Sequence, residues 1–424
     1  MKESFLHYIW SHQKFFNRNF QTQNGVSLAI LHPGVPNPNQ GPDFLDAKIY
    51  LDGLYWSGSV ELHVNASDWY RHGHQKDSNY EGVVLHVVWN FDIDVCYPNG
   101  NAIPTLELAD YVQKDLLDQY QNRFDQLPNF ISCEQHISQF SAVDWLGWQD
   151  RLFVERMESR LISIHELLKK FHNDWEAVLF VFLAKGFGLN LNGETFYEMA
   201  LQIPIKCIRQ LHIKTEDLEA LFMGQLGLLN SPLEDAYQKN LFHRYDYLKA
   251  KFHLKTFRSI PVKFGRLRPS NFPTIRLAQL AQLYSRNSSL FQSMVNCLSL
   301  DEAFELFRVQ ASSYWDQHFN FGVLGKIQPK VITRTFFNLI VINTLLPIRF
   351  AYQSYLGKDG AQDLFEWATQ IPSEHNRILD SFTKLGVPII NASSSQSLIH
   401  LFKNYCSNRK CLNCRVGFQL MKCN

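Results

Sequence analysis

Residues 42–63 read PDFLDAKIYLDGLYWSGSVELH and decide the fold of the N-terminal part of the chain. The segment 43–51 carries an apolar residue at every second position from Leu45 to Leu51, which predicts a strand with one apolar face. Asp52-Gly53 favours a tight hairpin turn, and 54–64 supplies the partner strand. The stretch therefore predicts an antiparallel hairpin.

The flanking segments predict further elements of a small mixed sheet. Residues 3–16 have the pattern of a short amphipathic helix, and 26–31 that of a strand. After a polar segment, 83–89 (VVLHVVW) is apolar on both faces, which is typical of a central strand. Residues 104–108 supply a further candidate strand, so we expect a small mixed α/β domain over 1–127.

After about residue 140, the apolar residues recur with the period of a helix instead of the alternation of a strand. A long amphipathic helix is predicted over 141–171, with Ser141 as its N-cap. Further helices are predicted over 174–184, 193–201, 215–228, 274–285, 300–312, 334–347, 360–369 and 374–385. The expected class is therefore α+β: the sheet domain, then an all-α domain over 141–400, then a cysteine-rich tail over 401–424.

Composition limits the class of protein. The 424 residues are 46% hydrophobic and only 19% charged, which argues against disorder because an average soluble protein has about 25% charged residues. No apolar run reaches 18 residues, so we expect no membrane span. The N-terminus lacks the apolar segment of a signal peptide, and a cytoplasmic location is expected. The sequence has neither a Gly-x-Ser-x-Gly motif nor a Walker-type loop, which disfavours serine hydrolases and P-loop ATPases.

Charge is distributed unevenly although the whole chain carries only +1. Residues 1–125 carry a net −7, whereas 247–300 hold nine basic residues and no acidic one. Such a tract predicts an electropositive face and a nucleic-acid partner, unless acids from elsewhere in the fold neutralise it. The candidate contacts precede or begin a predicted helix: Lys263, Arg266, Arg268 and Arg276. The alternative is a structural loop whose arginines pair with carboxylates.

Two carboxylates are predicted to meet at one end of the hairpin. Asp43 starts the first strand, and Glu61 and His63 project together from the second because residues two apart face the same way. Converging carboxylates are predicted to bind Mg²⁺ or Mn²⁺, which would activate water toward a phosphodiester. The alternative is that Asp43 is a turn residue and that Glu61 and His63 line a solvated face.

Pro42-Asp43, followed by Glu61-Leu62-His63 on the next strand, resembles the motif of the PD-(D/E)xK nuclease superfamily over about residues 1–110. The resemblance implies a restriction-endonuclease-like domain that hydrolyses DNA or RNA, with Asp43 and Glu61 as metal ligands. His63 stands where that motif has a lysine. A histidine is mostly neutral at pH 7, so it suits the role of base or ligand.

Histidines offer another metal site in the same region. His63, His72, His74 and His86 lie within 24 residues. His72 and His74, in a polar loop, could hold Zn²⁺ or Mn²⁺ together with Asp43 or Glu61. His86 lies in an apolar strand, which favours a hydrogen-bonded core histidine.

Four of the eight cysteines lie in the last 19 residues, in the spacing Cys406-x4-Cys411-x2-Cys414-x8-Cys423. Disulfides are rare in cytoplasmic proteins, so this pattern predicts a thiolate site for Zn²⁺ or an iron–sulfur cluster. The remaining cysteines, Cys133 among them, are scattered and are interpreted as buried small hydrophobic residues.

Strings along nearly the whole chain also resemble a bacterial family of unknown function. They include GPDFLDAKI, GSVELHV, DWYRHGH, YEGVVLHVVW, GFGLNLNGETF, EALFMGQLG and RLRPSNFPTIRLAQLA. This resemblance implies an architecture and no particular activity.

The expected function is metal-dependent phosphodiester hydrolysis on DNA or RNA. One alternative is a non-catalytic nucleic-acid-binding protein with a degenerate nuclease core and a structural metal. Another is a Zn- or Mn-dependent hydrolase of small molecules that uses the histidine cluster.

Overall fold

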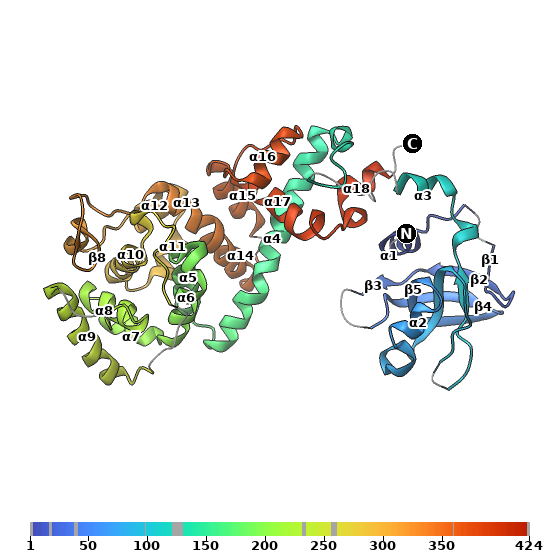
Figure 1. Ribbon diagram of the computed structural model, residues 1–424, viewed down its shortest axis with the longest axis horizontal. Coiled ribbons are helices and arrows are strands. Elements are labelled where there is room, and N and C mark those ends of the chain that lie inside the picture. The colour runs from blue at the N-terminus through green and yellow to red at the C-terminus, as the bar shows by residue number, and fades with distance from the viewer. Residues whose placement is uncertain are drawn as a thin grey trace. The chain divides into compact units, whose positions relative to one another are not determined.

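The computed structural model describes residues 3–16, 19–37, 41–97, 99–120, 130–230, 235–255, 261–358 and 360–421. The chain divides into two compact units (Figure 1). Unit 1 comprises residues 1–148, 376–388 and 398–424, and unit 2 comprises 149–375 and 389–397.

A seven-stranded mixed sheet lies at the centre of unit 1. Its strands are β1 (Phe20–Gln21), β2 (Ser27–His32), β3 (Val35–Pro36), β4 (Phe44–Leu51), β5 (Leu54–Asn65), β6 (Val83–Asn90) and β7 (Thr105–Glu107). The order is β1-β2-β4-β5-β6-β7, with β3 paired to β4. Pairing is antiparallel from β1 to β5 and parallel between β5, β6 and β7. The predicted hairpin and strands are confirmed.

The hairpin turn has the predicted geometry, but the start of β4 differs from the simple alternation. Asp52 and Gly53 both have positive φ angles, 49° and 76°, as a type I′ turn requires. At the other end of β4 the register shifts between Phe44 and Ala47. This bulge leaves Leu45 exposed, so Leu45 does not share the buried face of the strand as its position predicted.

Parallel pairing of β5 and β6 requires a crossover, and that crossover carries two of the candidate histidines. It contains α2 (Asp68–Arg71) and the 3₁₀ turns η1 (His74–Lys76) and η2 (Ser78–Tyr80). Helix α1 (Glu3–Ser11) packs on β5 and buries Phe5, Leu6 and Ile9. Segments far apart in sequence therefore meet on β5.

The rest of unit 1 is helical, and its helix α18 (Arg415–Leu420) packs against α1. It includes α3 (Lys114–Tyr120), the first turns of α4 (Ala142–Lys170), α16 (Arg377–Lys384), the end of α17 (Ala392–Leu401), the π-helical turn η9 (Phe402–Cys406), η10 (Cys411–Asn413) and α18 (Arg415–Leu420). Phe418 of α18 contacts the rings of Tyr8 and His12, and Phe130 stacks on Phe402. The tail thus packs against the N-terminal helix.

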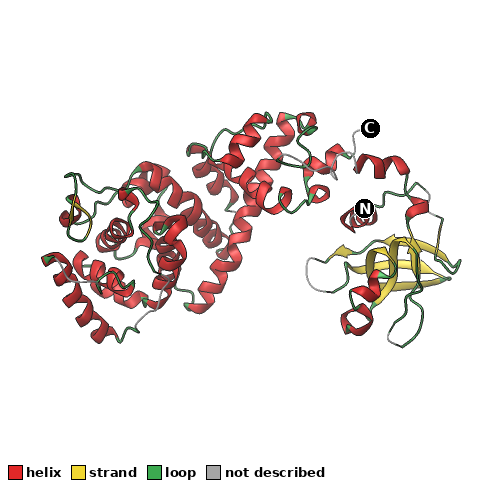
Figure 2. Ribbon diagram, in the orientation of Figure 1, coloured by secondary structure: helices red, strands yellow, loops and turns green. Residues whose placement is uncertain are grey.

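Unit 2 is built mainly from helices, drawn red in Figure 2. These helices surround one large apolar core. The predicted helices are present as α5 (Trp175–Phe187), α6 (Leu189–Gln202), α8 (Thr215–Gln225), α10 (Pro273–Arg286), α12 (Leu300–Phe307), α13 (Arg334–Ile340) continuing through η8 (Val341–Leu345) into α14 (Leu346–Tyr355), and α15 (Ala361–Gln370). The periodicity did not predict α7 (Ile205–Leu211), α9 (Ala236–Phe252) or α11 (Leu290–Asn296). A mixed sheet region followed by a large helical region confirms the α+β class.

The continuous helix Arg334–Tyr355 is long and apolar enough to cross a membrane by length and composition alone. However, 67% of its most apolar window is buried inside the structure, as in the core helix of a soluble protein.

Candidate metal centre

Asp43 and Glu61 are fixed against each other at the start of β4 and the middle of β5. The Asp43 N–H donates to Glu61 Oε2 at 3.0 Å, and the Leu62 N–H donates to Asp43 Oδ2 at 3.0 Å. Hydrogen bonds to a charged acceptor are among the stronger ones in proteins. The predicted convergence of the two carboxylates is present.

Helix α1 adds two groups that the sequence patterns did not single out. His7 Nε2 lies 3.3 Å from Asp43 Oδ2. Burial lowers the pKa of His7, but Asp43, Glu3 and Glu61 together raise it more, so the net shift is upward. Burial, with Asp43 and Glu61 nearby, also raises the pKa of Glu3. Only the packing of α1 on β5 reveals this, because Glu3 and His7 lie far from the motif in sequence.

Three imidazoles converge beside Glu61. Ligand atoms of His63, His72 and His74 all lie within 4.8 Å of one another. Glu61 Oε1 lies 3.2 Å from His74 Nε2 and 3.5 Å from His63 Nε2. His72 and His74 therefore reach the same place as the carboxylates, and the two sites that the sequence offered as alternatives are one cluster.

His86 supports this cluster from inside the sheet. It is fully buried on β6, and its Nε2 lies 2.8 Å from His63 Nδ1, within hydrogen-bonding distance. This placement agrees with its interpretation as a hydrogen-bonded core histidine. The contact also fixes the orientation of the His63 ring. The Nε2 atom of that ring lies 3.2 Å from His72 Nδ1.

The electrostatics of the cluster favour neutral imidazoles and a compensating cation. Burial, then the neighbouring histidines, lowers the pKa of His63 to about 2, and burial lowers that of His86 to about 3. Burial raises the pKa of Glu61, and the nearby charge of Asp43 adds to that rise. Neutral imidazole is the form that ligates metals, and a cation would offset the crowded carboxylates.

The donor set tests which metal the site fits. His74 Nε2 is buried and its close contact is Glu61 Oε1 at 3.2 Å, so these two atoms are placed to ligate one ion. Imidazoles suit Zn²⁺ and other transition metals, whereas carboxylates also suit Mg²⁺ and Mn²⁺. A mixed set of His63, His72, His74 and Glu61 therefore fits Mn²⁺ or Zn²⁺ better than Mg²⁺.

The candidate phosphate contacts of the basic tract divide into two groups. Lys263, Arg266 and Arg268 are exposed. Arg276 is buried in α10, where its guanidinium lies 3.4 Å from the centroid of the Phe336 ring. Its Nη1 and Nη2 donate to the side chains of Gln279 and Asn271. Arg276 is therefore not available to bind phosphate at the surface, because its side chain is buried and its guanidinium is hydrogen-bonded inside unit 2. The prediction that Arg276 contacts nucleic acid is wrong.

Three of the four predicted tail cysteines come together. Cys406, Cys411 and Cys414 line one small cavity, and among the described residues Cys133, which was predicted to be a scattered cysteine, lines it with them. Cys423 lies outside the described residues.

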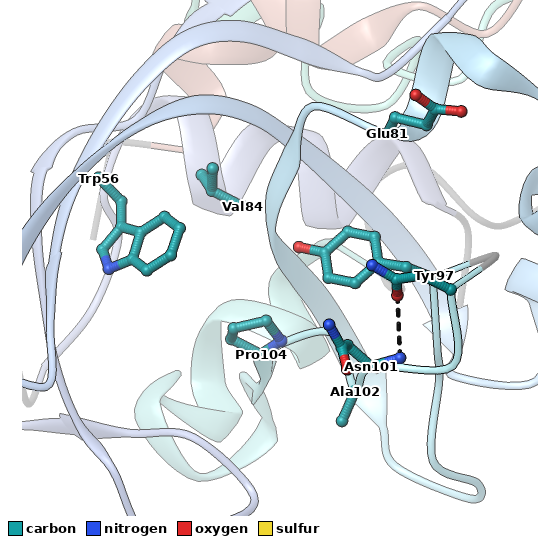
Figure 3. Close-up of a pocket in the computed structure, with 8 residues that line it drawn as sticks. Trp56, Glu81, Val84, Tyr97, Asn101, Ala102 and Pro104 are labelled. Carbon is teal, nitrogen blue, oxygen red and sulfur yellow. Dashed lines mark hydrogen bonds between the residues drawn. The ribbon is translucent and has the colours of Figure 1, made fainter.

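A cavity of about 660 Å³ lies beside the same strands (Figure 3). Trp56 of β5 and Val84 of β6 line it, five and two residues before Glu61 and His86. Tyr97 and the amides of Asn99 and Asn101 complete much of its wall. Aromatic and amide groups together suit a flat heterocycle that can stack and form hydrogen bonds.

A second cavity, of about 380 Å³, lies between α1 and the tail. Ser4, next to Glu3, lines it together with Arg409 and Lys410 of the loop before η10. Two basic residues of the tail therefore line a cavity next to α1, the helix that carries Glu3 and His7.

Comparison with known proteins places the chain in one family. No curated protein and no solved structure shows significant similarity to it. A family model described as "Protein of unknown function (DUF2851)" matches residues 3–377. Since this match covers most of the chain, the protein belongs to the DUF2851 family.

Proposed function

We propose that unit 1 is a metal-dependent phosphodiesterase that acts on DNA or RNA. The observation that carries the proposal is the position of Glu61, which lies between Asp43 on one side and His63 and His74 on the other. A divalent ion held there would polarise a phosphodiester and lower the pKa of an attacking water. Mn²⁺ accepts both kinds of ligand, so we expect it to be the most effective ion.

The order of elements supports a restriction-endonuclease-like core. Helix α1 precedes the hairpin β4–β5, and a crossover leads to the parallel strand β6. The carboxylates lie on the hairpin in the positions that the PD-(D/E)xK resemblance implies.

The position of His63 favours one of its two predicted roles, that of a metal ligand, over that of a base. His63 is buried, and its two ring nitrogens face His86 and His72. It is therefore suited to hold a metal and poorly suited to exchange a proton with bulk water. His72 is exposed beside the same ion position, and we assign to it the role of a metal ligand on the solvent side of the site.

Two features favour a nucleic-acid substrate. Trp56 and Tyr97 line the cavity on the strands of the site, and an aromatic wall binds bases by stacking. Arg409 and Lys410 supply positive charge near α1, and Arg71 lies close enough to lower the pKa of His63 as a minor cause. Phosphate contacts from such residues position a strand.

The histidine trio supports a second candidate, a Zn- or Mn-dependent hydrolase of small molecules, because three imidazoles with an open position are typical of catalytic zinc. This candidate predicts activity on small phosphate or carboxylic esters, no binding of polynucleotides, and activation by Zn²⁺.

The test is cleavage of labelled single- and double-stranded DNA and RNA by chelator-treated protein to which Mn²⁺, Mg²⁺ or Zn²⁺ is restored. Asp43→Asn and Glu61→Gln are compared with the matched control Asp46→Asn, an exposed carboxylate on the same strand. Cutting that requires metal and is lost only in the first two variants supports the nuclease. Salt-sensitive binding without cutting identifies a non-catalytic binding protein instead, and cleavage of small esters alone identifies the second candidate.

A further inference from the structure

Four cysteine side chains from distant parts of the sequence line one small cavity in unit 1. They are Cys133, in the turn after Phe130, and Cys406, Cys411 and Cys414 in the tail. None of the four forms a disulfide with a described residue. The other lining residues are Ile131, Ser132, Tyr405 and Gly417, so no carboxylate or imidazole among the described residues lines this cavity.

The tail backbone is folded to present its thiols on one side. The Lys410 N–H donates to the Tyr405 carbonyl, and the Cys414 N–H donates to the Cys411 carbonyl. A Cβ atom on Gly417 would lie 2.0 Å from the Cys411 carbonyl oxygen. Only glycine therefore allows α18 to pack this closely against the turn that contains the two cysteines.

Hydrogen-bond donors converge on Cys414. The backbone N–H groups of Val416 and Gly417 and the indole of Trp148 all lower its pKa, although burial is the largest influence and raises it to about 11. The buried Trp148 Nε1 has no full hydrogen bond to any described residue. An orphaned donor directed at a sulfur is a feature expected where that sulfur carries negative charge as a ligand.

The thiols lie close enough to influence one another. Burial raises the pKa of Cys406 and of Cys133, and the neighbouring thiols are the next causes in both cases. Such a group cannot ionise together in the absence of a cation, because each thiolate would repel the others in a poorly solvated site.

Four thiolates suit two kinds of metal site. A zinc ion binds four cysteine sulfurs in a tetrahedral site with Zn–S distances of about 2.3 Å, and an iron–sulfur cluster is also held by cysteine thiolates.

We propose that Cys133, Cys406, Cys411 and Cys414 ligate one metal centre, either a zinc ion or an iron–sulfur cluster, which joins the segment before α4 to the tail. This site is separate from the carboxylate and histidine cluster and does not depend on the activity proposed for it.

The test is the iron, zinc and acid-labile sulfide content of the full chain, purified without oxygen, with electron paramagnetic resonance after reduction. Wild type is expected to contain either stoichiometric zinc or iron and sulfide in equal amounts. Cys133→Ser and Cys414→Ser are expected to lose most of that metal, at least tenfold. Cys207→Ser, which changes a buried cysteine of unit 2, is expected to keep it.

Two outcomes overturn the proposal. Wild type purified without oxygen that contains neither stoichiometric zinc nor iron with sulfide excludes the metal centre, and metal that is kept in Cys133→Ser excludes Cys133 as a ligand. Because a serine variant could lose its fold together with the metal, X-ray absorption of wild type at the edge of the bound metal supplies an independent measurement. Absence of sulfur neighbours around the metal there contradicts the assignment.

Discussion

Asp43 and Glu61 are coupled through the backbone of the hairpin. The amide of Asp43 binds the carboxylate of Glu61, and the amide that follows Glu61 binds the carboxylate of Asp43, each at 3.0 Å. Two carboxyl groups are thereby held close together. Such preorganisation is costly for the metal-free protein and favourable for binding a divalent cation.

The first prediction concerns the free-energy cost of holding the carboxyl groups of Asp43 and Glu61 close together in the metal-free protein. Glu61→Gln keeps a carbonyl oxygen that can accept the Asp43 N–H, but it removes a charge that raises the pKa of Glu3 and His7. We expect Mn²⁺ affinity to fall at least about tenfold, the lower end of what even outer-shell changes cause. The unfolding free energy of the metal-free protein should not fall. Titration calorimetry and urea unfolding measure the two quantities, and unchanged Mn²⁺ affinity would remove Glu61 from the site.

The second prediction separates the histidine ligands from the carboxylates. His72→Ala and His74→Ala should each weaken Zn²⁺ binding by more than they weaken Mg²⁺ binding, since imidazole is a poor Mg²⁺ ligand. His165→Ala, an exposed histidine of α4, is the control and should change neither affinity. Equal losses for the two metals would indicate that the histidines act only through the fold.

The third prediction is a dependence of stability on pH. The folded pKa values of His63 and His86, about 2 and about 3, lie below the unfolded value of 6.5. In that window the unfolded chain binds more protons, so stability is full above pH 6.5 and is lost as the pH falls. Each histidine contributes on the order of 1 kcal/mol per pH unit, and the raised pKa of Glu61 opposes part of this near its own titration.

Urea unfolding at pH 7 and pH 5, with chelator present, tests this dependence. Wild type should be markedly less stable at pH 5, and His86→Gln should show a smaller difference between the two values. A wild-type protein that is equally stable at both values would show that these histidines are charged in the folded state.

The fourth prediction contrasts two arginines of the basic tract. Arg276→Ala should lower the unfolding free energy by roughly 2 kcal/mol, because it leaves buried hydrogen-bond partners unpaired and removes the contact with Phe336. Arg268→Ala removes an exposed charge and should leave stability unchanged within about 0.5 kcal/mol. If unit 2 binds nucleic acid, Arg268→Ala should also reduce the salt dependence of that binding. A neutral effect of Arg276→Ala on thermal unfolding would contradict the structural role.

The fifth prediction concerns the cavity that Trp56 and Tyr97 line. Trp56→Ala should weaken binding of a single-stranded oligonucleotide by about 1–3 kcal/mol, the usual contribution of one stacked base. Mn²⁺ affinity should stay the same. Tyr55→Ala, the more exposed aromatic neighbour that does not line the cavity, is the matched control. Loss of binding in Tyr55→Ala alone would place the nucleic acid elsewhere.

Local patterns predicted the hairpin and the convergence of Asp43 with Glu61, because turn chemistry and strand alternation act over a few residues. They did not find Glu3 and His7, which reach the site only through the packing of α1 on β5. Cys133 was missed for the same reason, since its partners lie at the other end of the chain.

Charge patterns were the least reliable guide. A run of basic residues without acids predicts a surface, but Arg276 is stacked on an aromatic ring inside the helical core. Hydrogen bonds and ring contacts that no spacing reveals decide which cations remain exposed. Lys263 and Arg268, in the loop before α10, are still exposed as the tract predicted.

The most direct measurement of the central claim is anomalous diffraction from crystals of the full chain soaked in Mn²⁺ after chelator treatment. The account predicts one strong anomalous peak bonded to Glu61 Oε1 and to at least two nitrogens of His63, His72 and His74. A saturating soak that leaves this cluster without a peak, while the carboxylates and imidazoles keep the positions described, would contradict the existence of the metal centre.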